Sequence, residues 1–169
     1  YKATDSYGQG MTATFMQVLK AYSVFNNGGK MVTPQIVDSL DFGLKKHHFK
    51  TKEPIRVIKQ STANEIKRLL IKTVEEGTGV AAKVKNIEVG GKTGTANISK
   101  GKVGYSKKRY ITSFFGFAND DKLKYTIGVK VREPEHKYYY ASQSAVPVFK
   151  EIINSLIALN YLEPKVQEK

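Results

Sequence analysis

The sequence predicts an α+β fold in which helices cover an antiparallel sheet. Apolar residues recur at helical spacing in three segments, whereas two neighbouring segments on either side of residue 120 have the pattern of strands. A short polar turn joins those two segments, which predicts an antiparallel pair. The length of 169 residues and the hydrophobic content of 40% suffice for one domain with a buried core. We therefore expect an antiparallel sheet of about three strands, with helices on one or both faces.

The first predicted helix begins at Thr14. Thr14-Phe15-Met16-Gln17 has the Thr-x-x-Gln form of a capping box, in which two side chains satisfy backbone N–H groups at a helix start. The run Asn26-Asn27-Gly28-Gly29 should end this helix, because Asn and Gly tolerate the left-handed cap conformation. Residues 32–40 favour an extended chain interrupted by a proline, and residues 41–54 favour a polar connector. The apolar stripe comprises Phe15, Val18, Leu19, Tyr22 and Phe25.

The second predicted helix begins at another capping box, Thr62-Ala63-Asn64-Glu65. Gly77-Thr78-Gly79 should end it. Residues 87–96 then predict a short strand, and a loop rich in Lys and Gly is expected to follow. The apolar stripe of the helix comprises Ile66, Leu69, Leu70 and Val74.

The last third of the chain predicts a hairpin and a closing helix. Residues 110–118 carry apolar or aromatic side chains on both faces, which indicates a central strand. Residues 119–122 have the composition of a turn, and residues 123–132 alternate as in a strand with one solvated face. Pro147 fits the first turn of a final helix. The apolar stripe of that helix comprises Phe149, Ile152, Ile153, Leu156 and Ile157.

The formal net charge of +13 raises the question of a polyanionic partner. Lysines cluster in residues 45–50 and 100–109, and both segments are expected to be loops. No zinc-finger, RNA-recognition or helix-turn-helix signature is present, so the sequence does not favour nucleic-acid binding. A basic face towards cell-wall polymer or lipid headgroups is the alternative, and scattered, solvated lysines are the plainer interpretation.

The composition excludes several kinds of site. There are no cysteines, which rules out disulfides, zinc–thiolate sites and thiol nucleophiles. No apolar run approaches the ~20 residues of a membrane span, and no segment resembles a signal peptide. The chain opens at Tyr1 without a Met, and we expect it to be a piece of a longer protein.

The most informative stretch is Val89-Gly90-Gly91-Lys92-Thr93-Gly94-Thr95-Ala96-Asn97, at the end of a predicted strand. Thr93 and Thr95 share one face of that strand, so their hydroxyls and the Lys92 ammonium form a donor set suited to a carboxylate or another anion. Gly94 lets a backbone amide approach a substrate, and an amide at a strand edge can stabilise an oxyanion.

This stretch has two other interpretations. It could be an ordinary turn, since a Lys-Thr-Gly triplet is common by chance. It also resembles the end of a nucleotide-binding P-loop, but that motif needs a glycine where Asn86 stands and a helix after the lysine. We therefore reject the P-loop.

Lys-Thr-Gly is one of the motifs of penicillin-binding proteins and class A β-lactamases. Together with other segments in the same order, it resembles the C-terminal part of the transpeptidase domain of a class B penicillin-binding protein, in particular the septal branch. The resemblance runs over most of the chain and implies the α+β fold of penicillin-binding and β-lactamase-like transpeptidases. The other segments are Tyr7-Gly8-Gln9-Gly10, Thr14, Gln17, Ala21-Tyr22, Asn27-Gly28-Gly29, Pro34, Glu75-Glu76-Gly77-Thr78-Gly79, Ala81-Ala82, Ser113-Phe114-Phe115-Gly116-Phe117-Ala118 and Ala145-Val146-Pro147-Val148-Phe149.

The resemblance implies a peptidoglycan D,D-transpeptidase that works through a serine acyl-enzyme in cell division. Lys92 would supply positive charge and hold the proton network. Thr93, Gly94 and Thr95 would bind the substrate, with the two threonines on its terminal carboxylate, and the Thr95 amide would be one oxyanion donor. The implied partners are the rest of the same domain, stem peptides, β-lactams and division proteins. No cofactor or metal is implied, and the implied location is the periplasmic face of the bacterial inner membrane.

The family's nucleophilic Ser-x-x-Lys and its Ser-x-Asn motif are not recognised here. Ser99-Lys100-Gly101-Lys102 matches the first by letters only, because it follows the Lys-Thr-Gly strand in a segment without an apolar stripe. A smaller departure is Phe15, where the family usually has proline. We therefore expect residues 1–169 to be the C-terminal portion of a transpeptidase domain, inactive alone and stable mainly with the missing half. The alternative is a non-catalytic module that binds peptidoglycan or division partners.

Three further groups have plain structural explanations. His47 and His48 are adjacent and His136 is distant, so exposed loop histidines are favoured over a shared metal site. Asp120 and Asp121 fit a hairpin turn better than paired catalytic carboxylates. Residues 138–140, three tyrosines, are expected to bury alternate rings against the final helix rather than to form a stacking platform.

Overall fold

The computed structural model describes residues 12–99 and 104–165 and has an α+β architecture. It combines helices with an antiparallel three-stranded sheet, which confirms the predicted fold class. Two short two-stranded ribbons accompany the sheet. The elements are α2 (Phe15–Asn26), β1 (Lys30–Met31), β2 (Ser39–Asp41), β3 (Lys46–His48), β4 (Ile55–Arg56), α3 (Gln60–Glu75), η1 (Val80–Ala82), β5 (Glu88–Ser99), β6 (Tyr105–Asn119), β7 (Lys124–Arg132), η3 (His136–Tyr138), η4 (Ala141–Gln143) and α4 (Ala145–Ala158).

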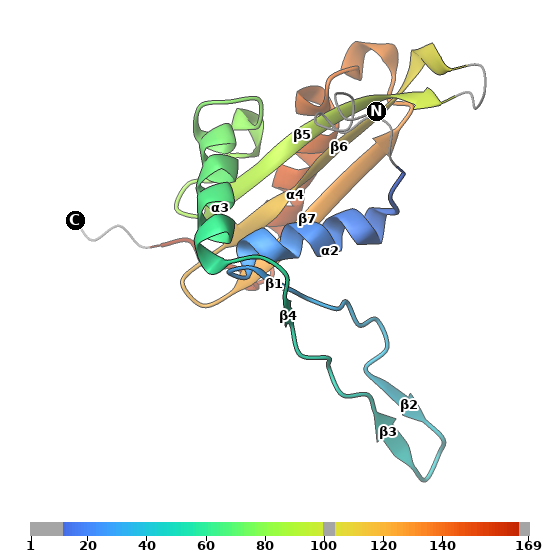
Figure 1. Cartoon of the computed structure of the whole chain (residues 1–169), viewed down its shortest axis with the longest axis vertical. Coiled ribbons are helices and arrows are strands. Elements are labelled where there is room, and N and C mark those ends of the chain that lie inside the picture. The colour runs from blue at the N-terminus through green and yellow to red at the C-terminus, as the bar shows by residue number, and fades with distance from the viewer. Residues whose placement is uncertain (1–11, 100–103, 166–169) are drawn as a thin grey trace.

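The main sheet has the strand order β5-β6-β7, so β6 is central, as its apolar residues on both faces predicted. Helix α2 lies on one face of the sheet and α4 on the other, while α3 packs on β5 (Figure 1). Two neighbouring phenylalanines of β6 show why both faces are covered. The ring centroid of Phe115 lies 5.2 Å from that of Phe15 on α2, and the centroid of Phe114 lies 4.6 Å from that of Phe149 on α4.

Helix α2 begins at the predicted capping box. The Thr14 hydroxyl accepts a hydrogen bond from the Gln17 amide at 3.2 Å, and the Gln17 side chain accepts one from the Thr14 amide at 2.8 Å. The helix ends at Asn27, and Gly28 and Gly29 follow with φ of 58° and 92°. The glycines therefore serve the backbone conformation that stops the helix.

The second predicted capping box is wrong. Helix α3 begins at Gln60 with Lys59 at the N-cap, so Thr62 and Glu65 lie inside the helix. The reason is tertiary: the amides of residues 57 and 58 donate to the Gly29 carbonyl, which keeps the chain extended only up to that point. Glu65 instead pairs with Arg68 one turn later, at 2.6 Å.

The expected polar connector at residues 41–54 is also wrong in part, because β2 and β3 form a hairpin there. Ser39 pairs with His48, and Asp41 pairs with Lys46. This hairpin projects away from the sheet and helices (Figure 1). Its short strands lack a sustained apolar alternation because they bury no face in the core, which is why the sequence pattern did not reveal them.

The Lys-Thr-Gly strand and its neighbour are longer than predicted. Strand β5 extends to Ser99 and β6 begins at Tyr105, so part of the expected basic loop belongs to the sheet. Residues 100–103 lie outside the described residues. The Asn97 side chain donates to the Ser106 carbonyl at 2.8 Å, beside an irregularity in the strand register. Backbone pairing therefore continues past the point where apolar side chains stop.

A polar network joins the sheet to helices α2 and α3. The Asn26 and Asn119 amides exchange hydrogen bonds of 3.0 and 2.7 Å, and Asn119 also donates to Glu88 at 2.8 Å. The Lys67 ammonium lies 2.5 Å from the same Glu88 carboxylate. Partial burial acts to raise the pKa of Glu88, but the hydrogen bonds from Lys67 and Asn119 outweigh it and hold the pKa below its ordinary value.

Both outer strands of the main sheet have an open side. Strand β5 pairs only with β6, and β7 pairs only with β6, within the residues that the structure describes. Unpaired strand edges are templates for further pairing.

Among the residues that the structure describes, no helix combines the length and hydropathy that a membrane crossing requires.

Candidate active site

Strand β5 places the Lys-Thr-Gly motif along an open edge of the sheet. The Gly91 carbonyl oxygen faces the Thr73 hydroxyl on α3, on the side away from β6. The N–H and C=O of one strand residue point to the same side, and alternate residues repeat that direction. The backbone groups of Thr93 and Thr95 therefore also face the open edge, where the Thr95 amide is directed away from β6.

The two threonine hydroxyls of the motif line one small hollow. This hollow has a volume of about 90 Å³, and Thr78 and Tyr140 form part of its wall. The Thr78 and Thr93 hydroxyl oxygens are 2.9 Å apart, within hydrogen-bond distance. Its full lining is Thr78, Thr93, Thr95, Tyr140, Ala141 and Ser142. The structure thus brings together the hydroxyls that strand periodicity predicted to share a face.

Lys92, the first residue of the motif, directs its side chain towards the next residue, Thr93. Its ammonium donates to the Thr93 carbonyl at 3.1 Å and to the Thr93 hydroxyl at 3.4 Å. Lys92 is exposed and does not line the hollow, unlike Thr93 and Thr95. Its charge is therefore fixed beside Thr93, next to the hollow and accessible to solvent.

Gly94 has a packing role that the sequence analysis did not foresee. A Cβ at this position would lie 2.6 Å from the Ser113 hydroxyl oxygen on β6. At Gly91 the same atom would lie 2.5 Å from the Phe114 ring. The glycines of the motif therefore allow β6 side chains to pack across β5, in addition to any access they give to a ligand.

The segment after β7 is held over the motif by a chain of hydroxyls. The Thr112 hydroxyl of β6 lies 2.8 Å from the Ser144 hydroxyl, which is 2.9 Å from the Tyr140 carbonyl. The Tyr139 ring packs on Tyr110 of β6, with centroids 4.2 Å apart. Burial of alternate rings against the final helix is therefore wrong, and Tyr138 and Tyr140 are 44% and 60% exposed.

The sequence analysis missed four residues of the hollow: Thr78, Tyr140, Ala141 and Ser142. The signal for Thr78 was present, because Gly77-Thr78-Gly79 was identified as a helix end and as part of the family pattern. Its approach to Thr93 depends on how α3 packs on β5, which no local pattern contains. Tyr140 and Ser142 reach the hollow through a long-range hydroxyl contact for the same reason.

The remaining candidate residues lie away from the motif. His47 and His48 are exposed on β3, and no group of three or more His, Asp or Glu side chains suited to a metal occurs among the described residues. Asp120 accepts hydrogen bonds from three backbone amides, those of Leu123, Glu163 and Lys122, which lower its pKa. This confirms the turn predicted there. Ser99 is the last residue of β5, and the lysine three residues later lies outside the described residues.

Comparison with known proteins agrees with the geometry. The family model described as "Penicillin binding protein transpeptidase domain" matches residues 1–154. The "Peptidoglycan D,D-transpeptidase FtsI homolog" of Mesostigma viride is 30% identical over 97% of this chain and 30% of its own length. "Stage V sporulation protein D" of Bacillus subtilis is 33% identical over 97% of this chain and 26% of its own length.

A solved structure shows the same fold. The transpeptidase domain of Burkholderia pseudomallei penicillin-binding protein 3 superposes with a TM-score of 0.78 at 31% identity, over 98% of this chain and 48% of that domain structure. The chain thus spans between about a quarter and a half of the proteins to which it is similar. On the match of residues 1–154, the chain belongs to the penicillin-binding protein transpeptidase domain family.

Proposed function

We propose that this chain supplies the Lys-Thr-Gly half of a peptidoglycan D,D-transpeptidase active site, and that the nucleophilic serine lies in the remaining portion of the same domain. The observation that carries the proposal is the donor set on β5. Two threonine hydroxyls line one hollow, a lysine ammonium lies beside Thr93, and the Thr95 amide faces the open strand edge. Such a set suits a carboxylate and a developing oxyanion side by side.

In the proposed reaction, the serine attacks the carbonyl of a D-Ala-D-Ala stem peptide and D-Ala leaves, which gives an acyl-enzyme. An amino group of a neighbouring stem then takes the acyl group and forms the cross-link. Thr93 and Thr95 bind the terminal carboxylate of the donor peptide. The Thr95 amide stabilises the oxyanion, and Lys92 adds positive charge. Thr78 holds the Thr93 hydroxyl in place through their 2.9 Å contact.

The proposal also includes a cellular role, which starts from the activity in the name of one relative. The FtsI homolog carries the name of a D,D-transpeptidase. We place this protein at the periplasmic face of the bacterial inner membrane, where it takes part in cell division with other division proteins and is a target of β-lactams. The open sides of β5 and β7 provide places for strands of the remaining half of the domain to pair.

A fluorescent penicillin tests the proposal directly. The protein sample is incubated with the reagent and separated on a denaturing gel. We expect label on the polypeptide that contains the serine, and none on a band of the size of this chain. Label on a band of this size would contradict the proposed division of the site and return attention to Ser99. Absence of label, with peptidoglycan binding retained, would favour the non-catalytic module.

Two variants test whether the threonine hydroxyls of the motif contribute to the rate of penicillin acylation. In the complete protein, T93V together with T95V removes both hydroxyls, and each lost hydrogen bond to a charged group corresponds to about 1.5–3 kcal/mol. The rate of penicillin acylation should therefore fall at least a hundredfold. T126V is the matched control, because Thr126 lies on β7 outside the hollow. Equal rates for both variants would exclude the proposed carboxylate site.

A further inference from the structure

We propose that the cleft at the root of the β2–β3 hairpin is a docking site for a peptide segment of another protein. The segment would carry an aliphatic or aromatic side chain next to carboxylates. The cleft lies away from the Lys-Thr-Gly motif and shares no residue with its hollow. The inference therefore does not depend on the proposed catalytic function.

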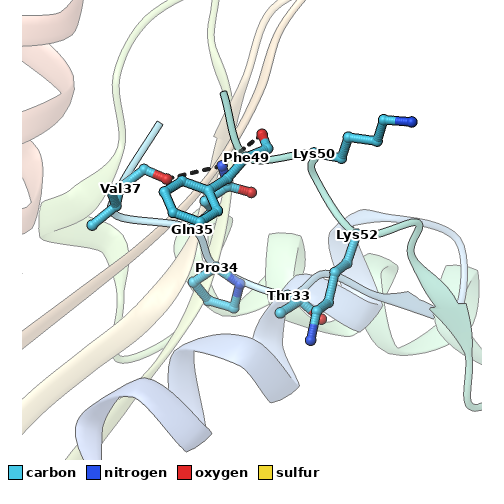
Figure 2. A pocket seen from close by; sticks show the side chains of 7 residues that line it. All are labelled: Thr33, Pro34, Gln35, Val37, Phe49, Lys50 and Lys52. Carbon is cyan, nitrogen blue, oxygen red and sulfur yellow. Dashed lines mark hydrogen bonds between the residues drawn. The ribbon is translucent and has the colours of Figure 1, made fainter. Parts of the chain in front are cut away.

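The cleft has a volume of about 320 Å³, which is larger than the hollow at the motif. Figure 2 shows the two chain segments that form it: one leads into β2 and the other follows β3. Pro34, Val37 and Phe49 supply its apolar surface. The complete lining is Thr33, Pro34, Gln35, Val37, Phe49, Lys50 and Lys52.

The walls of the cleft are fixed by hydrogen bonds. The Gln35 side-chain amide donates to the Val37 carbonyl at 3.0 Å and to the Phe49 carbonyl at 3.3 Å, and so joins the two sides (Figure 2). The Phe49 amide donates to the Asp38 carbonyl at 2.9 Å. The Phe49 ring also packs edge-on against His47, with centroids 5.1 Å apart. A ligand would meet a surface that is already ordered, which reduces the entropy cost of binding.

Apolar side chains are exposed both in the cleft and further along the hairpin, within the described part of the chain. Val37 is 49% exposed and Phe49 is 40% exposed. Phe42 and Leu44, near the tip, are 70% and 104% exposed. Several large apolar side chains exposed on one short segment of a folded domain are typical of a surface that contacts a partner.

The charges of the residues that line the cleft indicate the chemistry of the partner. Two of the residues that line the cleft are lysines and none is acidic, so carboxylates are the complementary groups. An anionic bilayer is the less suitable partner, because a flat anionic surface along the hairpin would also meet the exposed acidic residues Asp38, Asp41 and Glu53 of the same segment. A cleft of about 320 Å³ with three apolar lining residues instead fits one or two side chains of an extended segment, with acidic residues beside them.

The test is selection of random heptapeptides displayed on phage against the complete protein that carries this chain. In the complete protein, any part that covers the cleft naturally also covers it in the selection. We expect enrichment of sequences with a large apolar residue next to Asp or Glu. The affinity of the best peptide, measured by fluorescence anisotropy, should fall at least tenfold in the variant K50E/K52E.

The matched control is K45E/K46E, which makes the same charge change at the tip of the hairpin, outside the cleft. This variant should change the affinity less than twofold. An equal loss of peptide affinity in both variants would mean that only the overall charge of the hairpin matters, and it would overturn the proposal. Absence of enrichment, enrichment of sequences without carboxylates, or binding of phosphatidylglycerol vesicles that the peptides do not displace would overturn it as well.

Discussion

The β5-β6-β7 sheet and the β2–β3 hairpin are both antiparallel, yet they are stabilised in different ways. In the sheet, Phe114 and Phe117 are fully buried between layers of helix. In the hairpin, Phe42 and Leu44 are largely or completely exposed, and the strands contain three residues each. The sheet depends on burial of side chains, whereas the hairpin depends on backbone pairing and a few contacts at its root. Residues of one type should therefore differ sharply in importance between the two regions.

The strongest way to test this comparison is to truncate one aromatic ring in each region. F114A removes a ring that packs on Phe149 in the core, and such changes typically cost about 3–5 kcal/mol. F42A removes an exposed ring and should change the free energy of unfolding by less than about 0.5 kcal/mol. Urea unfolding followed by circular dichroism measures both. Similar values for the two variants would mean that the hairpin is also part of a core.

A second test concerns the buried polar network. N119A leaves the Asn26 amide and part of the Glu88 carboxylate without a partner, which should cost about 2 kcal/mol. N154A is the control, because the Asn154 amide donates a hydrogen bond to the exposed Glu151 one turn earlier on α4. Its expected effect is below about 0.5 kcal/mol. A loss as large for N154A as for N119A would show that the network has no special importance.

The pH dependence of stability gives a smaller and more specific effect. The pKa of Glu88 is lowered in the folded state, so the ionised carboxylate contributes stability above the unfolded pKa of about 4.3. That contribution should be lost as the pH falls through the lower folded value. Urea midpoints from pH 7 to pH 3 should therefore decrease less in E88Q than in the wild type. Parallel pH profiles would mean that Glu88 titrates alike in both states.

The smallest effect is expected when the hairpin is removed. Asp38 and Phe49 are joined by a backbone hydrogen bond, so residues 39–48 can be replaced by an Asn-Gly turn. We expect the free energy of unfolding to change by less than about 1 kcal/mol, because few apolar side chains lose buried contacts. Thermal unfolding of the shortened protein checks this. A loss comparable with that of F114A would contradict the distinction between the two regions.

The same distinction explains how much of the fold could be predicted. The sequence correctly indicated the sheet, the central position of β6 and the start of α2, because burial imposes period 2 or 3.6 on the residues involved. The hairpin and residues 105–109, at the start of β6, were missed. Residues such as Lys46 and His48 lie in strands but bury nothing, so no pattern records their conformation.

The candidate site was predictable to a similar extent. Strand periodicity placed Thr93 and Thr95 together, since both lie on one local element. The contribution of Thr78 and Tyr140 required knowledge of which distant elements meet at β5. The packing constraint on Gly94 from Ser113 likewise depends on the register between β5 and β6. Local chemistry could be inferred from one segment, whereas the walls of the hollow could not.

The contact between Thr73 and the Gly91 carbonyl limits what can bind along the open edge of β5. An extended ligand that adds to this edge as a further strand would need the outward backbone groups of every second residue. Those of Gly91 are covered by helix α3, whereas those of Thr93 and Thr95 are not. Helix α3 therefore limits the register of such a ligand strand. The ligand can pair with β5 from Thr93 towards Ser99, but it cannot shift by two residues to pair with Gly91.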